Sequence, residues 1–316
     1  SSSALELGAP DNPVPRIFPL FKLSGLVWCL TLQHHNLDTV TMLNISSIIR
    51  VLVVIAALVP PTRAVAQRDD ARWIEDCREN SGDRWRRRET YCEVREMRVR
   101  APSDNISMDG LRNGGVSVSG WDRDSLVVRT RIQVTARTQS DARDIARQIR
   151  TTLRGSTVVV EGPRHDDDDE HWSASLIANV PRRTNLTVGT SNGPVTVENV
   201  KGDISLRTSN GPMTLRDLAG SVNARTTNGP LSISLSGNRW DGSGLEARTT
   251  NGPLTISVPD SYNAHLEAGT TNGPVSLGFP ITVVGRITRD ISTDLGSGGA
   301  TIRATTTNGP LSIRRR

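Results

Sequence analysis

The sequence predicts an all-β protein, a β-solenoid of the parallel β-helix or β-roll kind, with about 18 residues per coil and a small N-terminal cap of strands and one helix. Three observations predict this fold. The pentapeptide Thr-(Ser/Thr)-Asn-Gly-Pro, here called the refrain, occurs six times, and alternating apolar and polar residues follow each copy. Glycine also recurs every nine residues from Gly193 to Gly229. A fixed period of this size is the sequence signature of a repeat architecture.

The refrain sets the length of the predicted coil. Its asparagines are 18, 18, 23, 21 and 36 residues apart, and the last spacing equals two periods of 18. We therefore expect coils stacked in chain order over residues 186–316, with Asn308 in the last refrain at the end of the stack. The six asparagines are Asn192, Asn210, Asn228, Asn251, Asn272 and Asn308.

Each predicted coil contains two short strands, and parallel stacking places equivalent residues of successive coils ~4.8 Å apart. The alternation then gathers apolar side chains into columns, with small alanines facing larger isoleucines and leucines. Because no coil can bury its apolar face alone, contacts between neighbouring coils have to supply the stability. One such column contains Val195, Met213, Leu231, Leu254, Val275 and Leu311.

The refrain has a mechanical explanation. Glycine before proline tolerates backbone angles that other residues avoid, and proline starts a strand where no donor is needed. The asparagine side chain can bond its counterpart one coil away, which predicts an amide ladder through all six refrains. A buried or half-buried structural stack is favoured over a polar recognition strip, because a recognition site rarely needs six copies of one tripeptide. We expect Asn228→Ala to destabilise the fold more than Asn308→Ala.

The N-terminal region has the pattern of an export signal. Residues 42–66 begin with Met, contain an apolar stretch and end in Ala-Val-Ala, which predicts a secretory signal peptide cut after Ala66. The alternative is a membrane anchor, but the apolar run Val51–Val59 is shorter than the ~20 residues that span a bilayer. Residues 1–41 are then interpreted as an over-extended translation start, and no transmembrane segment is expected in the mature chain.

Two cysteines, Cys77 and Cys92, remain after the predicted cleavage, in a charged segment at residues 67–100. An even cysteine count in an exported protein favours a disulfide between them. Two free thiols are the alternative. Between the cysteines lies the basic run Arg84–Arg88, which is interpreted as a solvated loop, with contact to an anionic surface as the other possibility.

Residues 101–185 are predicted to form the cap. Short alternating segments predict strands, and Ser140–Arg150 predicts one helix with Ser140 as its N-cap. The run His165–His171 carries carboxylates and imidazoles that could hold a cation. A solvated hairpin loop is favoured, because consecutive charges repel one another and no glycine shapes a coordination loop.

Chemical motifs are scarce, so we predict no catalytic residues, no metal site and no cofactor. The turns carry Asn-Gly-Pro and lack the recurring aspartate of calcium-binding nonapeptide repeats. After residue 66 the chain has 34 basic and 30 acidic residues, a balance that does not argue for nucleic acid. A carbohydrate-active solenoid enzyme is the main alternative, because Glu246 and Glu267 could stack as a pair of carboxylates.

The segment Gly115–Asp124 with its Gly-Trp-Asp, the helix at Ser140, the Val180-Pro181 pair and the repeated Thr-Ser-Asn-Gly motif resemble the bacterial "putative adhesin" family. This family is a domain of unknown function found in exported proteins, and the resemblance covers residues 94–313. It implies a β-solenoid fold and an envelope location. It offers no catalytic residues to carry over.

The functional hypothesis is a non-enzymatic, adhesin-like scaffold exported to the periplasm, cell surface or medium, which binds envelope or surface components. A purely structural periplasmic module is a further alternative. Arg207, Arg225 and Arg248 occupy one position in three coils, each three residues before the refrain asparagine, and alternation points them outward. Such a stripe suits an anion, either acidic polysaccharide or an anionic lipid headgroup. The alternative is a solvated edge whose arginines pair with acids such as Glu246.

Overall fold

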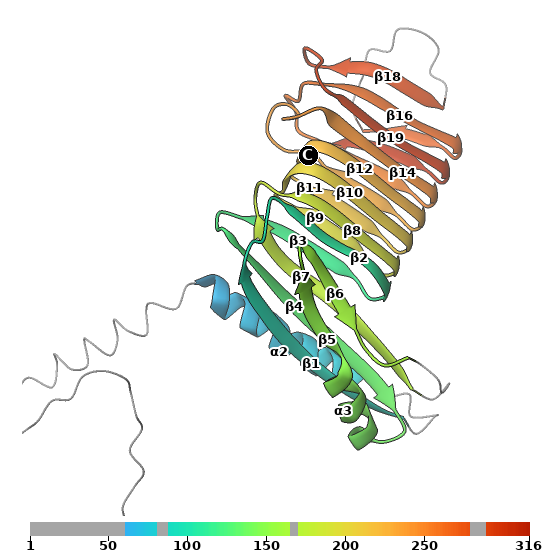
Figure 1. Ribbon diagram of the computed structural model, residues 1–316. Coiled ribbons are helices and arrows are strands. Elements are labelled where there is room, and N and C mark those ends of the chain that lie inside the picture. Colours follow the sequence, from blue (N-terminus) through green and yellow to red (C-terminus); the bar gives the residue numbers. More distant parts are fainter. Residues whose placement is uncertain (1–60, 81–87, 165–169, 279–288) are drawn as a thin grey trace, which may run out of the picture. The chain divides into compact units, whose positions relative to one another are not determined.

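The computed structural model describes residues 61–80, 88–164, 170–278 and 289–316, all within the compact unit Pro60–Arg316. These residues form the helices α2 (Pro61–Asn80) and α3 (Gln139–Gln148) and two sheets of ten strands each (Figure 1). The protein is therefore mostly β, as predicted. None of the described helices is both long enough and apolar enough to cross a membrane.

The first sheet combines antiparallel cap strands with parallel strands of the repeats. In spatial order it contains β1 (Glu89–Arg100), β4 (Ser125–Ala136), β7 (His171–Pro181), β3 (Val116–Trp121), β9 (Val195–Glu198), β11 (Met213–Arg216), β13 (Leu231–Ser234), β15 (Leu254–Val258), β20 (Leu311–Arg315) and β17 (Val275–Leu277).

The second sheet follows the same plan. Its spatial order is β18 (Asp290–Leu295), β16 (Ala264–Asn272), β19 (Thr301–Asn308), β14 (Gly244–Asn251), β12 (Ala219–Asn228), β10 (Lys201–Asn210), β8 (Asn185–Asn192), β2 (Asn105–Asn113), β6 (Thr157–Glu161) and β5 (Arg150–Arg154). The cap strands β1, β4 and β5 pair antiparallel, and so does β18. Because β18 lies within residues 186–316, the expectation of parallel stacking in this region is wrong for it.

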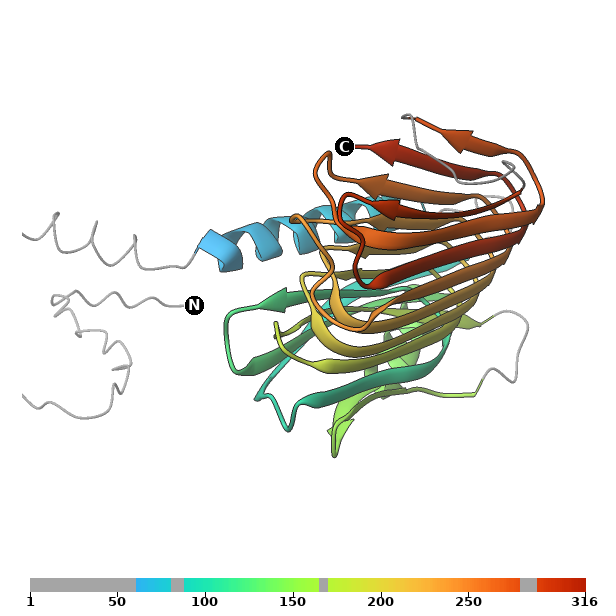
Figure 2. The ribbon, with the colours of Figure 1, turned by 90° about the horizontal axis from the view of Figure 1, so that it is seen from above.

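Each repeat contributes one strand to the second sheet, then a refrain turn, then one strand to the first sheet. We call this unit a coil. Equivalent residues of neighbouring coils are paired, as in Ile204 with Val222 and Met213 with Leu231, so the predicted register is confirmed. Strands β2 and β3 form an earlier coil of the same kind, and they stack in parallel on β8 and β9. The stacked strands can be followed from above in Figure 2.

The order of the coils departs from the sequence prediction. The last coil, β19 and β20, lies between the coil of β14 and β15 and the coil of β16 and β17 (Figure 1). Asn308 therefore has a repeat neighbour on each side, and Asn272 belongs to the outermost coil of the stack. Identical refrains give the same hydrogen-bonding groups to every coil, so the sequence pattern does not specify which coil is the neighbour of which.

The main core lies between the two sheets and includes the predicted columns. Val195, Met213, Leu231, Leu254 and Leu311 are fully buried, and Val275 in the short outer strand β17 is half-buried. The alanines of the opposite strands are equally buried, and they keep the core thin. The buried alanines in the predicted column of the second sheet are Ala224, Ala247, Ala268 and Ala304.

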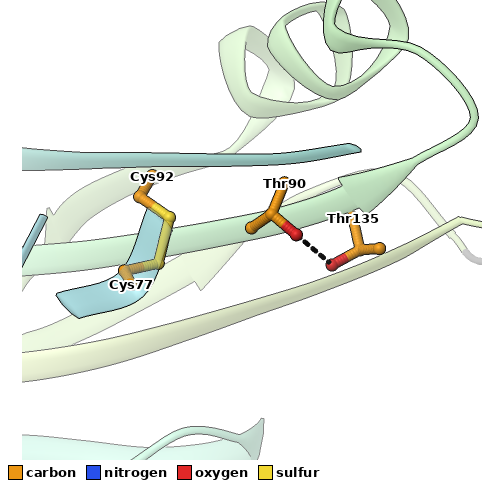
Figure 3. Close-up of a disulfide and its surroundings, with 4 residues drawn as sticks. All are labelled: Cys77, Thr90, Cys92 and Thr135. Atoms are coloured by element: carbon orange, nitrogen blue, oxygen red, sulfur yellow. Dashed lines mark hydrogen bonds between the residues drawn. A yellow bond between two sulfur atoms is a disulfide. The ribbon is translucent and has the colours of Figure 1, made fainter. Parts of the chain in front are cut away.

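The N-terminal part is more regular than predicted. The charged segment at residues 67–100 contains most of helix α2 and the whole of the twelve-residue strand β1, neither of which was predicted. A disulfide joins Cys77 in α2 to Cys92 in β1 (Figure 3). The side chain of Asp70 in α2 forms ion pairs with Arg129 at 3.0 Å and Arg131 at 3.1 Å, which hold the helix against strand β4.

Several sequence predictions concern residues outside the described ranges, and one concerns the start of helix α3. The predicted leader (1–41), most of the signal peptide (42–66), Arg84–Arg87 and residues 165–169 of the acidic loop lie outside the described residues. Helix α2 continues through the predicted cleavage point, and cleavage there stays a prediction. The N-cap of α3 is Thr138, whose Oγ1 accepts from the Asp141 backbone N–H at 3.1 Å, so the assignment to Ser140 is wrong.

Candidate functional site

The refrain asparagines form one continuous amide ladder along the turns. From Asn192 onward, each side-chain Nδ2 donates to the Oδ1 of the asparagine before it in the stack, at 2.8–3.0 Å in all six links. Asn113 of the early coil is a seventh member, which the sequence prediction did not include. In spatial order the ladder runs through Asn113, Asn192, Asn210, Asn228, Asn251, Asn308 and Asn272.

The buried polar column of the refrain is threonine. The asparagines are exposed, so the expectation of a buried or half-buried amide stack is wrong for them. The first threonine of each refrain is buried, and its Oγ1 donates to a glycine carbonyl of the neighbouring coil, as Thr208 does to Gly193 at 3.2 Å. Side chains of the refrain therefore tie successive coils together both inside and at the surface. The six threonines are Thr190, Thr208, Thr226, Thr249, Thr270 and Thr306.

The position of Asn308 changes one expected mutational result. Asn308 donates to Asn251 and accepts from Asn272, whereas Asn272 bonds one asparagine among the residues that the structure describes. We expect Asn308→Ala to cost about 1–2 kcal/mol, as much as Asn228→Ala, because each loses two hydrogen bonds, and Asn272→Ala to cost about half of that. Urea unfolding midpoints of the three variants measure these costs. A smaller loss for Asn308→Ala than for Asn272→Ala would contradict the observed order of the coils.

The three predicted arginines lie side by side on the outer face of the second sheet. Arg207 pairs in register with Arg225, and Arg225 pairs with Arg248, so they occupy adjacent strands β10, β12 and β14. All three are exposed. We call them the arginine stripe. Paired residues on adjacent strands are ~4.8 Å apart, a spacing at which three cations repel one another.

One carboxylate partly compensates the arginine stripe. Glu246 Oε1 lies 2.6 Å from Arg248 Nη2 and 3.9 Å from Arg225 Nη2. Arg207 has no ion-pair partner among the described residues. The predicted alternative, pairing with Glu246, therefore accounts for one close contact, and the stripe keeps an excess of positive charge.

A polar hollow runs beside the arginine stripe on the same face. It consists of two adjoining cavities of 440 and 300 Å³, which share Ser221 and Asn223. It crosses strands β2, β8, β10, β12, β14 and β19, and we call it the polar trough. Its polar lining residues are Asn105, Ser107, Ser156, Asn185, Thr187, Asp203, Ser205, Ser221, Asn223, Ser243, Glu246, Thr301 and Arg303.

Glu246 and Glu267 are not direct neighbours in the second sheet. Arg303 of the inserted strand β19 is paired in register with Glu246 on one side and Glu267 on the other, so the two glutamates are not stacked as predicted. Hydrogen bonding from Arg303, together with its charge, holds the pKa of Glu267 below its usual value. A general acid needs a raised pKa, so Glu267 is poorly suited to that role.

A serine, a histidine and an aspartate also meet, on strands β16 and β18. His265 Nδ1 lies 2.7 Å from Asp294 Oδ1, and its Nε2 lies 3.3 Å from Ser292 Oγ. This order of contacts matches a nucleophilic triad. The contacts are exposed, however, and none of the three residues lines the polar trough. The three side chains therefore form a polar link between strands β16 and β18.

A comparison with protein families shows to which family the chain belongs. A family model described as Toastrack DUF4097 matches residues 78–314, about three quarters of the sequence. The chain belongs to this family. The predicted resemblance to an adhesin-like domain of unknown function is thereby confirmed. The Toastrack region includes both sheets, the arginine stripe and the polar trough, and it begins inside helix α2.

Several solved structures are similar to the Toastrack region. A "putative cell adhesion protein" from Clostridium sporogenes is 10% identical with a TM-score of 0.42, over 72% of this chain and 100% of that chain. A "putative adhesin" from Bacteroides fragilis is 10% identical with a TM-score of 0.33, over 72% and 97%. A "putative lipid binding protein" from Parabacteroides distasonis is 11% identical with a TM-score of 0.28, over 70% and 96%. No curated protein matches the chain.

Proposed function

We propose that this protein is an exported, non-enzymatic scaffold of the bacterial envelope, whose coils form a β-solenoid and present the arginine stripe to an anionic partner. The observation that carries the proposal is the in-register exposure of Arg207, Arg225 and Arg248, with Glu246 as their one ion-pair partner in the described part of the chain. The guanidinium group of arginine binds carboxylate and phosphate groups through two parallel hydrogen bonds. An anion across the stripe relieves the repulsion between the three cations.

Two further features support an envelope role. The Cys77–Cys92 disulfide suits an oxidising compartment outside the cytoplasm, which agrees with the predicted signal peptide. Hydrogen bonds of the threonine and asparagine side chains stack the coils in register, so equivalent outward side chains of successive coils lie one above the other. A face of this kind presents charged groups at a regular spacing to a repeating partner.

The test is a triple variant, Arg207→Gln, Arg225→Gln and Arg248→Gln, measured by equilibrium binding to an acidic polysaccharide and to anionic vesicles at low and high salt. We expect about tenfold weaker binding at low salt, because three exposed ion pairs of ~0.5 kcal/mol each give about 1.5 kcal/mol. The difference should shrink at high salt, since salt screens exposed charges.

The matched control replaces Arg98, Arg147 and Arg154 by glutamine. These residues also carry ion pairs to neighbouring acids, lie on β1, α3 and β5, and give the same change of net charge. The control variant should bind as the wild type does. Equal losses of binding affinity in the two triple variants would show that net charge alone causes the effect. An absence of anion binding by the wild type would refute the proposed function.

A further inference from the structure

The polar trough has a chemistry of its own, separate from the charge of the arginine stripe. Its floor carries hydroxyl and amide side chains from the five strands β2, β8, β10, β12 and β19, and apolar residues such as Ile204 and Val222 are buried beneath them. Strand β14 adds the carboxylate of Glu246. Among the described residues, the side chains of Thr187, Ser205 and Asn223 have no hydrogen-bond partner. They therefore present free donors and acceptors at the surface.

One end of the polar trough is held in place by hydrogen bonds. Asn185 Nδ2 donates to Asn105 Oδ1 at 3.0 Å, and Asn185 Oδ1 accepts from the Asp203 backbone N–H at 2.9 Å. Asp203 adds an exposed carboxylate with no ion pair among the described residues. A carboxylate of this kind accepts hydrogen bonds only, so it matches the hydroxyl donors of a sugar.

The arginine stripe borders this floor. Ser205 and Arg207 are two residues apart on β10, as Asn223 and Arg225 are on β12, so both point to the same face about 6.6 Å apart. The polar trough crosses six strands, which corresponds to on the order of 25 Å. A ligand that fills it therefore needs hydroxyl groups along its length and acidic groups along one edge.

This combination distinguishes between the two anionic partners. A bilayer presents headgroup charges on a broad surface and favours protruding cations beside apolar anchors. The hollowed floor between β2 and β19 offers hydroxyl and amide groups to an elongated molecule instead. Resting on the proposed function, we infer that the polar trough is a subsite for an acidic polysaccharide, whose hydroxyls bond the floor while its carboxylates meet the arginine stripe.

The test separates hydroxyl recognition from charge. The full chain is titrated with polygalacturonate chains of defined length, with inorganic polyphosphate and with phosphatidylglycerol vesicles. The trough variant is Ser205→Ala with Asn223→Ala, and the control is Thr214→Ala with Ser232→Ala, which changes similar residues on the first sheet. We expect the trough variant to bind polygalacturonate about tenfold more weakly, since each hydrogen bond lost is worth about two- to tenfold. Its binding to polyphosphate should not change.

Chain length gives a second readout. Affinity for polygalacturonate should rise with length until the chain spans on the order of 25 Å and then level off, because further sugars find no further subsites. Equal binding of polyphosphate and polygalacturonate, with no effect of the trough variant, would overturn the polysaccharide subsite while leaving anion binding by the arginine stripe intact. Stronger binding to vesicles than to polygalacturonate would also overturn it. Failure of all three probes to bind would remove the proposed function itself.

Discussion

Replacing Gly211 by alanine is expected to destabilise the fold by about 3 kcal/mol, at the upper end for overpacking a tight interior. A Cβ atom at Gly211 would lie 2.2 Å from the Gly193 carbonyl oxygen and 2.6 Å from the carbonyl carbon. Both contacts are with backbone of the neighbouring coil, which cannot rotate away as a side chain could. The clash recurs at the other refrain glycines, so this close approach is the reason that the refrain requires glycine at its fourth position.

Urea unfolding of Gly211→Ala measures this cost, and Ser209→Ala is the control. Ser209 belongs to the same refrain but is exposed, so its replacement should change the free energy of unfolding by less than about 0.5 kcal/mol. Equal midpoints for Gly211→Ala and the wild type would show that the turns are not packed against one another as described.

Removing the disulfide is expected to cost a similar amount. The bond between Cys77 and Cys92 closes a loop of 15 residues, and constraining a loop of this length in the unfolded chain is worth about 3 kcal/mol. The double variant Cys77→Ser with Cys92→Ser should therefore unfold at a lower urea concentration than the wild type. Helix α2 would then depend on the Asp70 ion pairs and on packing against β1.

A reducing agent provides the control for the disulfide. Dithiothreitol should bring the wild type close to the double variant and leave the double variant unchanged. Thiol titration of the denatured wild type should find neither of these cysteines free. Two reactive thiols at these positions, or a wild-type unfolding midpoint that dithiothreitol does not change, would contradict the disulfide and weaken the case for export.

The sequence was sufficient to predict the repeat register. The refrain and the alternation after it placed Val195, Met213 and Leu231 in one buried column, and all three are there. The same alternation predicted that the arginine stripe lies outward and in register. These predictions succeed because strand periodicity and stacking are local rules, which repeat in every coil.

The order of the coils could not be predicted in the same way. The refrains at Asn251, Asn272 and Asn308 offer the same groups, so any of these coils can pair with either of the others. The spacing of 36 residues between the last two refrains was interpreted as two periods of stacking in chain order. Instead, β18 turns back antiparallel to β16, and the last coil is inserted on the other side of β16.

The helix and strand of the charged segment at residues 67–100 could not be predicted for a different reason. Helix α2 and strand β1 carry charges on exposed positions, and few apolar side chains mark a buried face. Contacts with residues far away in the sequence stabilise this helix and strand, such as the ion pairs of Asp70 with Arg129 and Arg131. No local periodicity could have indicated those partners.

The polar trough and the seventh ladder member were missed because they join separate parts of the chain. Asn105 and Asn113 in β2 lie beside Asn185 and Asn192 in β8, about eighty residues later. One signal was present, since Asn113-Gly114-Gly115 is a refrain-like turn followed by an alternating strand. This turn lacks the proline of the refrain, and its spacing to Asn192 does not fit the period of 18 residues.

Arginine protection is the most direct test of the proposed binding face. The wild-type protein is treated with phenylglyoxal, with and without polygalacturonate, and modified arginines are located by mass spectrometry. We predict that polygalacturonate protects Arg207, Arg225 and Arg248, while Arg147 and Arg154, which are exposed on other elements, stay reactive. Unchanged modification of the arginine stripe, or equal protection of all five arginines, would contradict the account.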